Sequence, residues 1–150
     1  MDAVTYPDPR VIDFIEKKMI PVRVAFDAQP LAADFNVKWT PTLITLDIHG
    51  KEHHRTLGFL SPEELIPSLL LGKAKCHFDL DETQEALNPL DAILQDYPQS
   101  EAAPEAVYLR GVSTYKNTHN AAPLKEAYEM LKERYPSSQW TKRAYPYRLL

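Results

Sequence analysis

The 150-residue chain has 44% apolar and 25% charged residues, proportions that are ordinary for a soluble protein. A net charge of −4 without a basic stripe excludes nucleic acid as an expected partner. The single cysteine, Cys76, excludes an intrachain disulfide and any dithiol reaction within one chain.

The first 40 residues predict two helices and a strand. Asp8 and Pro9 are residues typical of a helix start, and an apolar stripe and two lysines follow them. The alternating apolar residues of "PVRVAFD" predict a strand over residues 21–27. The next segment, "QPLAADFNV", predicts a short helix that begins near Pro30.

A β-hairpin is predicted next. "TLITLDI" (42–48) is a nearly continuous apolar run, "HGKE" makes a turn at Gly50, and "HHRTLGF" (53–59) returns as an antiparallel partner. Ser61 then caps a helix in "SPEELIPSLLLG", and we expect Pro67 to bend or split that helix.

From about residue 77 the pattern predicts helices only, and a repeat is visible. "LDAILQDYPQS" at 90–100 matches "YEMLKERYPSS" at 128–138, at an offset of about 38 residues. Periods of this length with two helices per unit indicate a helical solenoid.

Residues 1–75 resemble the thioredoxin superfamily. The matching segments are "MDAVTYPDPRVIDFI", "IPVRVAFD", "FNVKWTPTLITLDIHGKE" and "LGFLSPEEL". The resemblance covers the second half of that fold and implies an α/β domain, a partial thioredoxin-like sheet with flanking helices. It also implies that the family's preceding central strand and its Cys-x-x-Cys motif are missing here.

Residues 76–150 resemble tetratricopeptide repeats, on "APEAVYLRGVSTYKNTHNAAPLKEAYEMLKERYPSS". This resemblance implies an all-α helical-repeat domain that binds a protein or peptide. Solenoid units usually need about three stacked copies, so these helices must also dock on the α/β part, on a second copy or on a partner.

Three explanations fit the missing central strand. Its two neighbours, predicted at 21–27 and 42–48, pair directly; or a second chain completes the sheet in a homodimer; or the native protein begins upstream of Met1. As written, the chain lacks a signal peptide and a membrane-spanning run, so we expect a cytoplasmic protein without a membrane partner. A longer native chain would fit a periplasmic or secreted protein.

Thr40 and Pro41 match the position of the family's cis-proline, which implies a cis bond and an edge where an extended substrate pairs. The other interpretation of Pro41 is a trans residue that opens a strand. Trp39 and Phe35 fit either a groove for a partner or packing of the short helix, and packing is the simpler interpretation.

In the repeat half, aromatic residues such as Tyr108 and Tyr115 fall at helical spacings, and most are expected to pack between helices. Some of them, with Arg110 and Lys116, are candidates for a concave partner-binding surface.

Two further groups of residues are candidate sites. Lys73, Lys75 and His77 flank Cys76, and cationic neighbours can activate a thiol, although a lone cysteine is more often a buried apolar residue. His53 and His54 are expected to point to opposite faces of the hairpin, which argues against a metal site. No pattern typical of a cofactor site or a catalytic residue set is present.

The sequence therefore favours a non-catalytic protein-interaction module built from a degenerate or truncated thioredoxin-like domain and repeat helices. The alternative is a thiol–disulfide oxidoreductase whose Cys-x-x-Cys motif lies upstream of residue 1.

Overall fold

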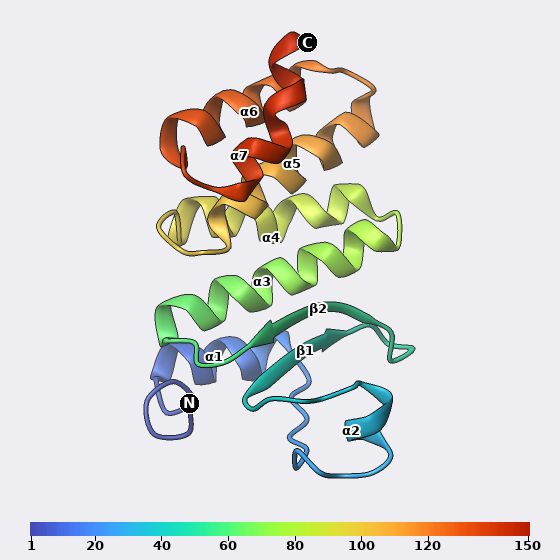
Figure 1. Cartoon of the computed structure of the whole chain (residues 1–150), viewed down its shortest axis with the longest axis vertical. Helices are drawn as coiled ribbons and strands as arrows, with labels where there is room; N and C mark the ends of the chain where they lie inside the picture. Colours follow the sequence, from blue (N-terminus) through green and yellow to red (C-terminus); the bar gives the residue numbers. More distant parts are fainter.

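The structure, a computed structural model, describes all 150 residues and is 57% helical. The elements in chain order are α1 (Pro9–Lys18), α2 (Leu31–Asp34), β1 (Thr42–Leu46), β2 (Glu52–Leu57), α3 (Pro62–Asp79), α4 (Thr83–Asp96), α5 (Ala103–Thr118), α6 (Ala122–Arg134), α7 (Gln139–Ala144) and the 3-10 helix η1 (Tyr145–Leu149). Helices α3 to α7 are stacked above the hairpin, and α1 and α2 lie at the other end of an elongated molecule (Figure 1).

The sheet has only two strands, β1 and β2, in antiparallel order. The hairpin forms where it was predicted, and Gly50 provides the positive φ of its turn, +80°. The predicted strand over residues 21–27 is wrong: this segment is extended but pairs with no strand. The explanation in which it pairs directly with β1 is therefore also wrong. Alternating apolar and polar residues give a segment the two faces of a strand, but a strand forms only where a neighbouring strand supplies backbone hydrogen bonds.

Local signals account for the helix boundaries. The Asp8 carboxylate accepts a hydrogen bond from the Arg10 N–H at the start of α1, and Pro9 occupies the first position of that helix. Pro67 does not split α3, which is continuous. The carbonyl that loses its helical partner to this proline belongs to Glu63, one turn earlier, and Glu63 is exposed.

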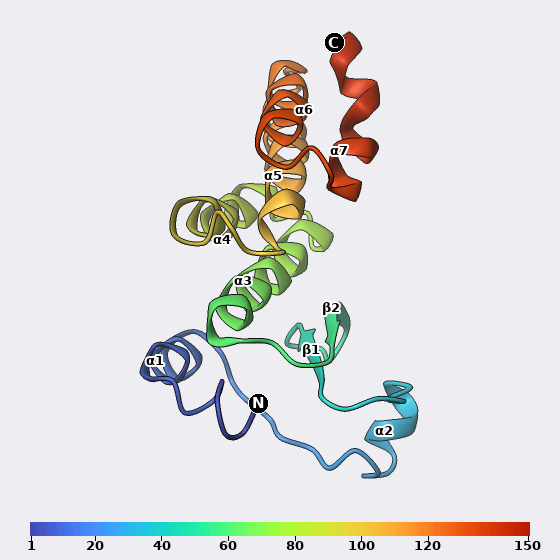
Figure 2. The same ribbon diagram turned by 60° about the vertical axis from the view of Figure 1, so that its left-hand side comes forward.

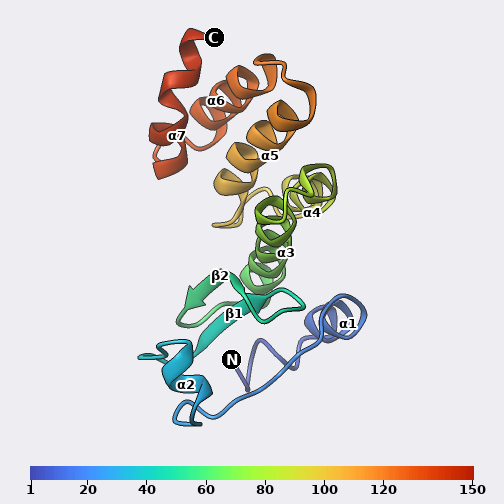
Figure 3. The ribbon, with the colours of Figure 1, turned by 90° about the vertical axis from the view of Figure 1, so that its right-hand side faces the viewer.

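Helix α3 joins the two parts of the molecule. One side of α3 packs on the hairpin, and the other side packs on α4 (Figure 3). Gly72 makes the close contact with the sheet: a Cβ at this position would lie 3.0 Å from the Thr45 Cβ. Because α3 spans residue 75, the predicted boundary between residues 1–75 and 76–150 falls inside one continuous helix. That boundary stays a prediction.

Most of the buried side chains lie in the helical array. The largest cluster joins α3, α4 and α5 around Leu90 and Ile93, and a second cluster joins α5, α6 and α7 around Leu131. The third is smaller, and in it Val11 of α1 packs with Leu65 and Ile66 of α3. The hairpin end of the molecule is therefore held mainly through its contact with α3.

The 38-residue repeat is visible in the structure. Helices α4 and α6 both end in a tyrosine, Tyr97 or Tyr135, whose backbone N–H bonds the carbonyl four residues earlier. The following serine, Ser100 or Ser138, then donates its backbone N–H to the tyrosine carbonyl. Equivalent sequences thus make the same helix ending in both units.

Candidate partner-binding site

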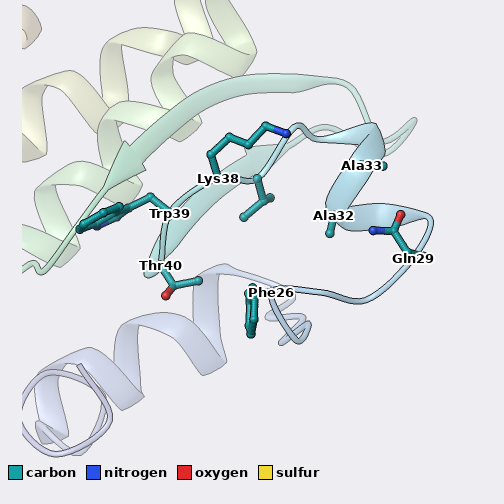
Figure 4. A pocket seen from close by; sticks show the side chains of 8 residues that line it. Phe26, Gln29, Ala32, Ala33, Lys38, Trp39 and Thr40 are labelled. Carbon is teal, nitrogen blue, oxygen red and sulfur yellow. The ribbon is translucent and has the colours of Figure 1, made fainter.

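An open cleft of about 540 Å³ lies beside the start of β1. Its lining comes from the extended segment before α2, from α2 itself and from the loop that leads into β1 (Figure 4). The lining residues are Phe26, Gln29, Ala32, Ala33, Val37, Lys38, Trp39 and Thr40. Two large aromatic side chains among these residues, Phe26 and Trp39, are 68% and 66% exposed, and the Trp39 ring points away from α2 (Figure 4).

Trp39 differs from the simpler expectation that it packs in the core. Its side chain is mostly exposed, whereas Phe35 is half-buried and its carbonyl accepts a hydrogen bond from Arg55 of β2. Helix α2 has only four residues, so it offers too small a surface to cover a second large aromatic ring. Trp39 is therefore not a core residue, and its role in a groove for a partner stays a prediction.

Thr40 and Pro41 lie between the cleft and β1. The Thr40–Pro41 peptide bond is cis, as is Gln29–Pro30. Thr40 is exposed and lines the cleft, and the Pro41 carbonyl accepts a hydrogen bond from the backbone N–H of Gly58. This bond continues the β1–β2 ladder by one residue, so the backbone at the cleft is held by the sheet.

The repeat-half candidates are largely occupied by contacts within the chain. Tyr108 lies 5.1 Å from Trp140 and 5.8 Å from Tyr147, measured between ring centroids, and so packs α5 on the C-terminal helices. Arg110 pairs with Asp91 of α4.

Lys116 pairs with Asp81 and lies over the ring of Phe78. Tyr115 is 39% exposed and makes no side-chain hydrogen bond. Of these four candidates, only Tyr115 is free of a specific partner.

His53 and His54 both contact α3, which differs from the expectation of opposite faces. The ladder register shifts after Thr45, which pairs with His54, so that His53 has no residue opposite it. Such a bulge re-aims side chains. His53 lies between two carboxylates, Asp79 (2.7 Å) and Asp47 (3.2 Å).

The two histidines also differ in protonation. The hydrogen bond that the His53 ring donates to the Asp79 carboxylate raises the pKa of His53, whose side chain is buried. Burial lowers the pKa of His54 to about 4, and the nearby Lys75 ammonium adds to the effect. No group of three His, Cys, Asp or Glu side chains is arranged to hold a metal ion.

The Cys76 thiol is partly buried on α3. Burial raises the pKa of this thiol, and the carboxylates of Asp47, Glu82 and Asp79 add to the effect. The lysines that flank it in sequence therefore do not produce the anionic form that an activated thiol requires.

Six of the eight lining residues are not among the candidates predicted from the sequence, namely Phe26, Gln29, Ala32, Ala33, Val37 and Lys38. Phe26 falls in the segment predicted as a strand, and that prediction does not account for its exposure. The signal that could have identified it is the shortness of the helix that follows, which limits how much apolar surface can be covered there.

Comparison with known families gives one match. The tetratricopeptide repeat family model matches residues 68–100, which extend from within α3 to the turn that follows α4. The match supports tetratricopeptide-like helices over residues 76–100 of the predicted repeat half. It begins within the segment that resembles thioredoxins, and residues 103–138, on which the repeat resemblance rests, lie outside it. Neither the comparison with curated proteins nor the comparison with solved structures gave a match. None of the helices has the length and apolar composition needed to span a bilayer.

Proposed function

We propose that this chain is a non-catalytic protein-interaction module that binds a partner at the cleft beside β1. Tetratricopeptide repeats typically mediate protein–protein contacts, and the family match supports this general role. The observation that carries the proposal is the exposure of Phe26 and Trp39 on one cleft. Exposed aromatic side chains that line a cavity are the residues that most often dominate the energy of an interface.

The helical array has a supporting role in this proposal. Its aromatic and charged candidates hold α4, α5 and the C-terminal helices together, as the contacts of Tyr108, Arg110 and Lys116 show. The array therefore fixes α3, and α3 in turn fixes the hairpin that borders the cleft. Tyr115 remains a candidate for a second contact.

The test is selection of peptides from a displayed random library on the 150-residue chain. Trp39→Ala is expected to weaken selected peptides by at least about tenfold, since a hot-spot aromatic contributes about 2 kcal/mol or more. Ile48→Ala is the matched control, because Ile48 is an equally apolar and 94% exposed residue at the tip of the hairpin. Peptides that bind with unchanged affinity to both Trp39→Ala and Phe26→Ala would contradict the proposal.

The second candidate function is a thiol–disulfide oxidoreductase with a Cys-x-x-Cys motif upstream of this chain. It is supported by the thioredoxin resemblance and by the position of Thr40 on a cleft that a substrate can reach. The 150-residue chain is expected to show no reduction of insulin, because it has no dithiol. Turnover that disappears in Cys76→Ser would contradict this expectation, and turnover by a longer chain would favour the oxidoreductase.

A further inference from the structure

The turn end of the hairpin, residues 46–53, is joined to the C-terminal turn of α3 through one side chain. His53 is buried, with its Nδ1 2.7 Å from an Asp79 carboxylate oxygen and its Nε2 3.2 Å from an Asp47 carboxylate oxygen. No other side chain of residues 46–53 makes a hydrogen bond to α3. Of the helices, only α3 packs on the two strands (Figure 2). His53 is therefore the polar link between the turn end and the helical array.

The two carboxylates at His53 differ in their freedom to move. The Asp47 side chain is 4% exposed, and its carboxylate also accepts hydrogen bonds from the backbone N–H groups of His49 and Lys51. The Asp79 side chain is 45% exposed and belongs to the last residue of α3. The Asp47 carboxylate is therefore fixed within the turn, whereas the Asp79 carboxylate has room to rotate into water.

The charged groups that face His53 are these two carboxylates, Asp47 from the hairpin and Asp79 from α3. The Cys76 thiol, one turn before Asp79 on α3, lies near the same pair and near Glu82. Burial and these carboxylates raise the pKa of the thiol, so Cys76 brings no charge at neutral pH.

The cationic side chains beside Cys76 along α3 have other partners. Lys75 forms an ion pair with Glu105 of α5, and His77 forms one with Glu82. A proton on His53 is therefore the positive charge that lies between the two carboxylates of the link.

The charge of the imidazole decides whether both hydrogen bonds of His53 exist. The imidazolium donates from both ring nitrogens, whereas the neutral ring has one N–H and one lone pair. When the N–H lies on Nε2, toward the fixed Asp47 carboxylate, the Nδ1 lone pair faces the Asp79 oxygen at 2.7 Å. Two acceptors repel each other at this distance, and the exposed Asp79 carboxylate is the one that can leave.

We propose that the proton on His53 is a switch that joins the turn end of the hairpin to the C-terminal turn of α3. Loss of the proton frees the turn end from Asp79 and leaves the turn itself intact through Asp47. The contact of Gly72 with Thr45, two helical turns earlier on α3, contains no titratable group and stays in place. The cleft lies beside the start of β1, whereas this link lies beyond the end of that strand, so the inference does not rest on the proposed function.

The pH dependence of the link follows from the hydrogen bonds of His53. The bond to Asp79 raises the pKa of His53 from its ordinary value of 6.5. The link is therefore complete below about pH 6.5 and is lost as the pH rises through the raised value. Between these two values the equilibrium constant for the link falls about tenfold per pH unit, because only the linked form holds the proton.

The test is an NMR titration of the isotope-labelled 150-residue chain. The ring nitrogens of His53 are expected to titrate above the ordinary value. The nuclear Overhauser contact between His53 and Asp79 is expected to be lost above that titration point, whereas the contacts of His53 with Asp47 and of Gly72 with Thr45 persist. A His53–Asp79 contact that survives the titration would overturn the switch. Loss of the Asp47 contact at the same pH would overturn it too, because the turn itself would then have opened.

Asp79→Asn separates the charge of the link from its packing. This variant is expected to shift the titration point of His53 downward, toward the ordinary value, and the turn end should separate from α3 at that lower pH. Glu82→Gln is the matched control, because it removes a nearby carboxylate that pairs with His77 instead, and the titration of His53 should stay unchanged. An unchanged titration point in Asp79→Asn, or an equal downward shift in both variants, would overturn the inference.

Discussion

Two adjacent histidines hold the hairpin on α3 through opposite protonation states. His53 contacts a carboxylate with each ring nitrogen, an arrangement that both nitrogens can satisfy as donors only in the imidazolium form. His54 accepts a hydrogen bond from the Lys75 ammonium at Nδ1, so the neutral ring carries its proton on Nε2, near Ser68 and Thr56. The two side chains therefore respond to pH in opposite directions.

Stability is expected to fall on both sides of a maximum near pH 6.5. The folded-state pKa of His53 is raised, so its stabilisation is complete below about pH 6.5 and is lost as the pH rises through that raised value. The pKa of His54 is lowered to about 4 in the folded chain. Below about pH 6.5 the unfolded chain therefore binds a proton at this residue that the folded chain does not bind, and stability also falls from about pH 6.5 to pH 4.

His53→Gln tests the alkaline side. The variant is expected to lose about 1 kcal/mol of unfolding free energy at pH 6, less than a fully buried pair would, because solvent reaches the half-exposed Asp79. The loss should shrink toward pH 9, as measured by urea denaturation. His49→Gln, at an exposed position in the hairpin turn, should follow the wild-type profile. A loss that is equal at both pH values would mean that His53 acts only by packing.

Cys76 is expected to react slowly. Since burial and nearby carboxylates raise the pKa of its thiol, less thiolate is present at pH 7.5 than in the unfolded chain. Alkylation by iodoacetamide should therefore be slower in buffer than in urea, as followed by mass spectrometry. A faster reaction in the folded protein would restore Cys76 as a candidate reactive thiol.

At the scale of secondary-structure elements, the repeat supplies a comparison within one chain. Tyr97 and Tyr135 occupy the same position of their units, but only Tyr135 donates its hydroxyl across units, to the Pro98 carbonyl at 2.6 Å. Tyr97 packs beside the α1–α3 cluster, and its hydroxyl makes no hydrogen bond. The same sequence signal thus has two tertiary roles.

Tyr135→Phe is expected to cost about 0.5–1.5 kcal/mol of unfolding free energy, because it removes a hydrogen bond and leaves the Pro98 carbonyl without it. Tyr97→Phe, the matched control, should change stability by less than about 0.5 kcal/mol. Thermal or urea unfolding measures both. An equal cost for the two variants would mean that the hydroxyl bond adds nothing to ring packing.

At the scale of the whole molecule, stability is distributed unevenly. Only three of the 25 buried residues lie before residue 61, namely Thr5, Val11 and Ala32. The array from α3 to α7 contains the rest. Few buried contacts mean a low free energy of local opening, so the hairpin end should open without unfolding the array.

Native-state hydrogen exchange is expected to show this division. Amides of α1 and β1 should exchange through openings of lower free energy than those of α4 and α5, whose contacts form the largest core. Equal protection throughout the chain would mean that α3 couples both parts into one cooperative unit.

Much of the local structure could be predicted from the sequence, since its causes lie within a few residues. Asp8 and Pro9 start α1, Gly50 turns the hairpin, and the Tyr-Pro pairs end α4 and α6. These signals act through caps, turns and backbone preferences, which do not depend on distant segments.

Only the tertiary structure decided what distant segments do. Residues 21–27 alternate like a strand but find no neighbour to pair with, and the bulge at His53 depends on how β2 meets β1 and α3. Trp39 is exposed because α2 is too short to cover it. The periodicity of a sequence specifies which face of a segment is apolar, but the partner of that face depends on contacts between residues far apart in the chain.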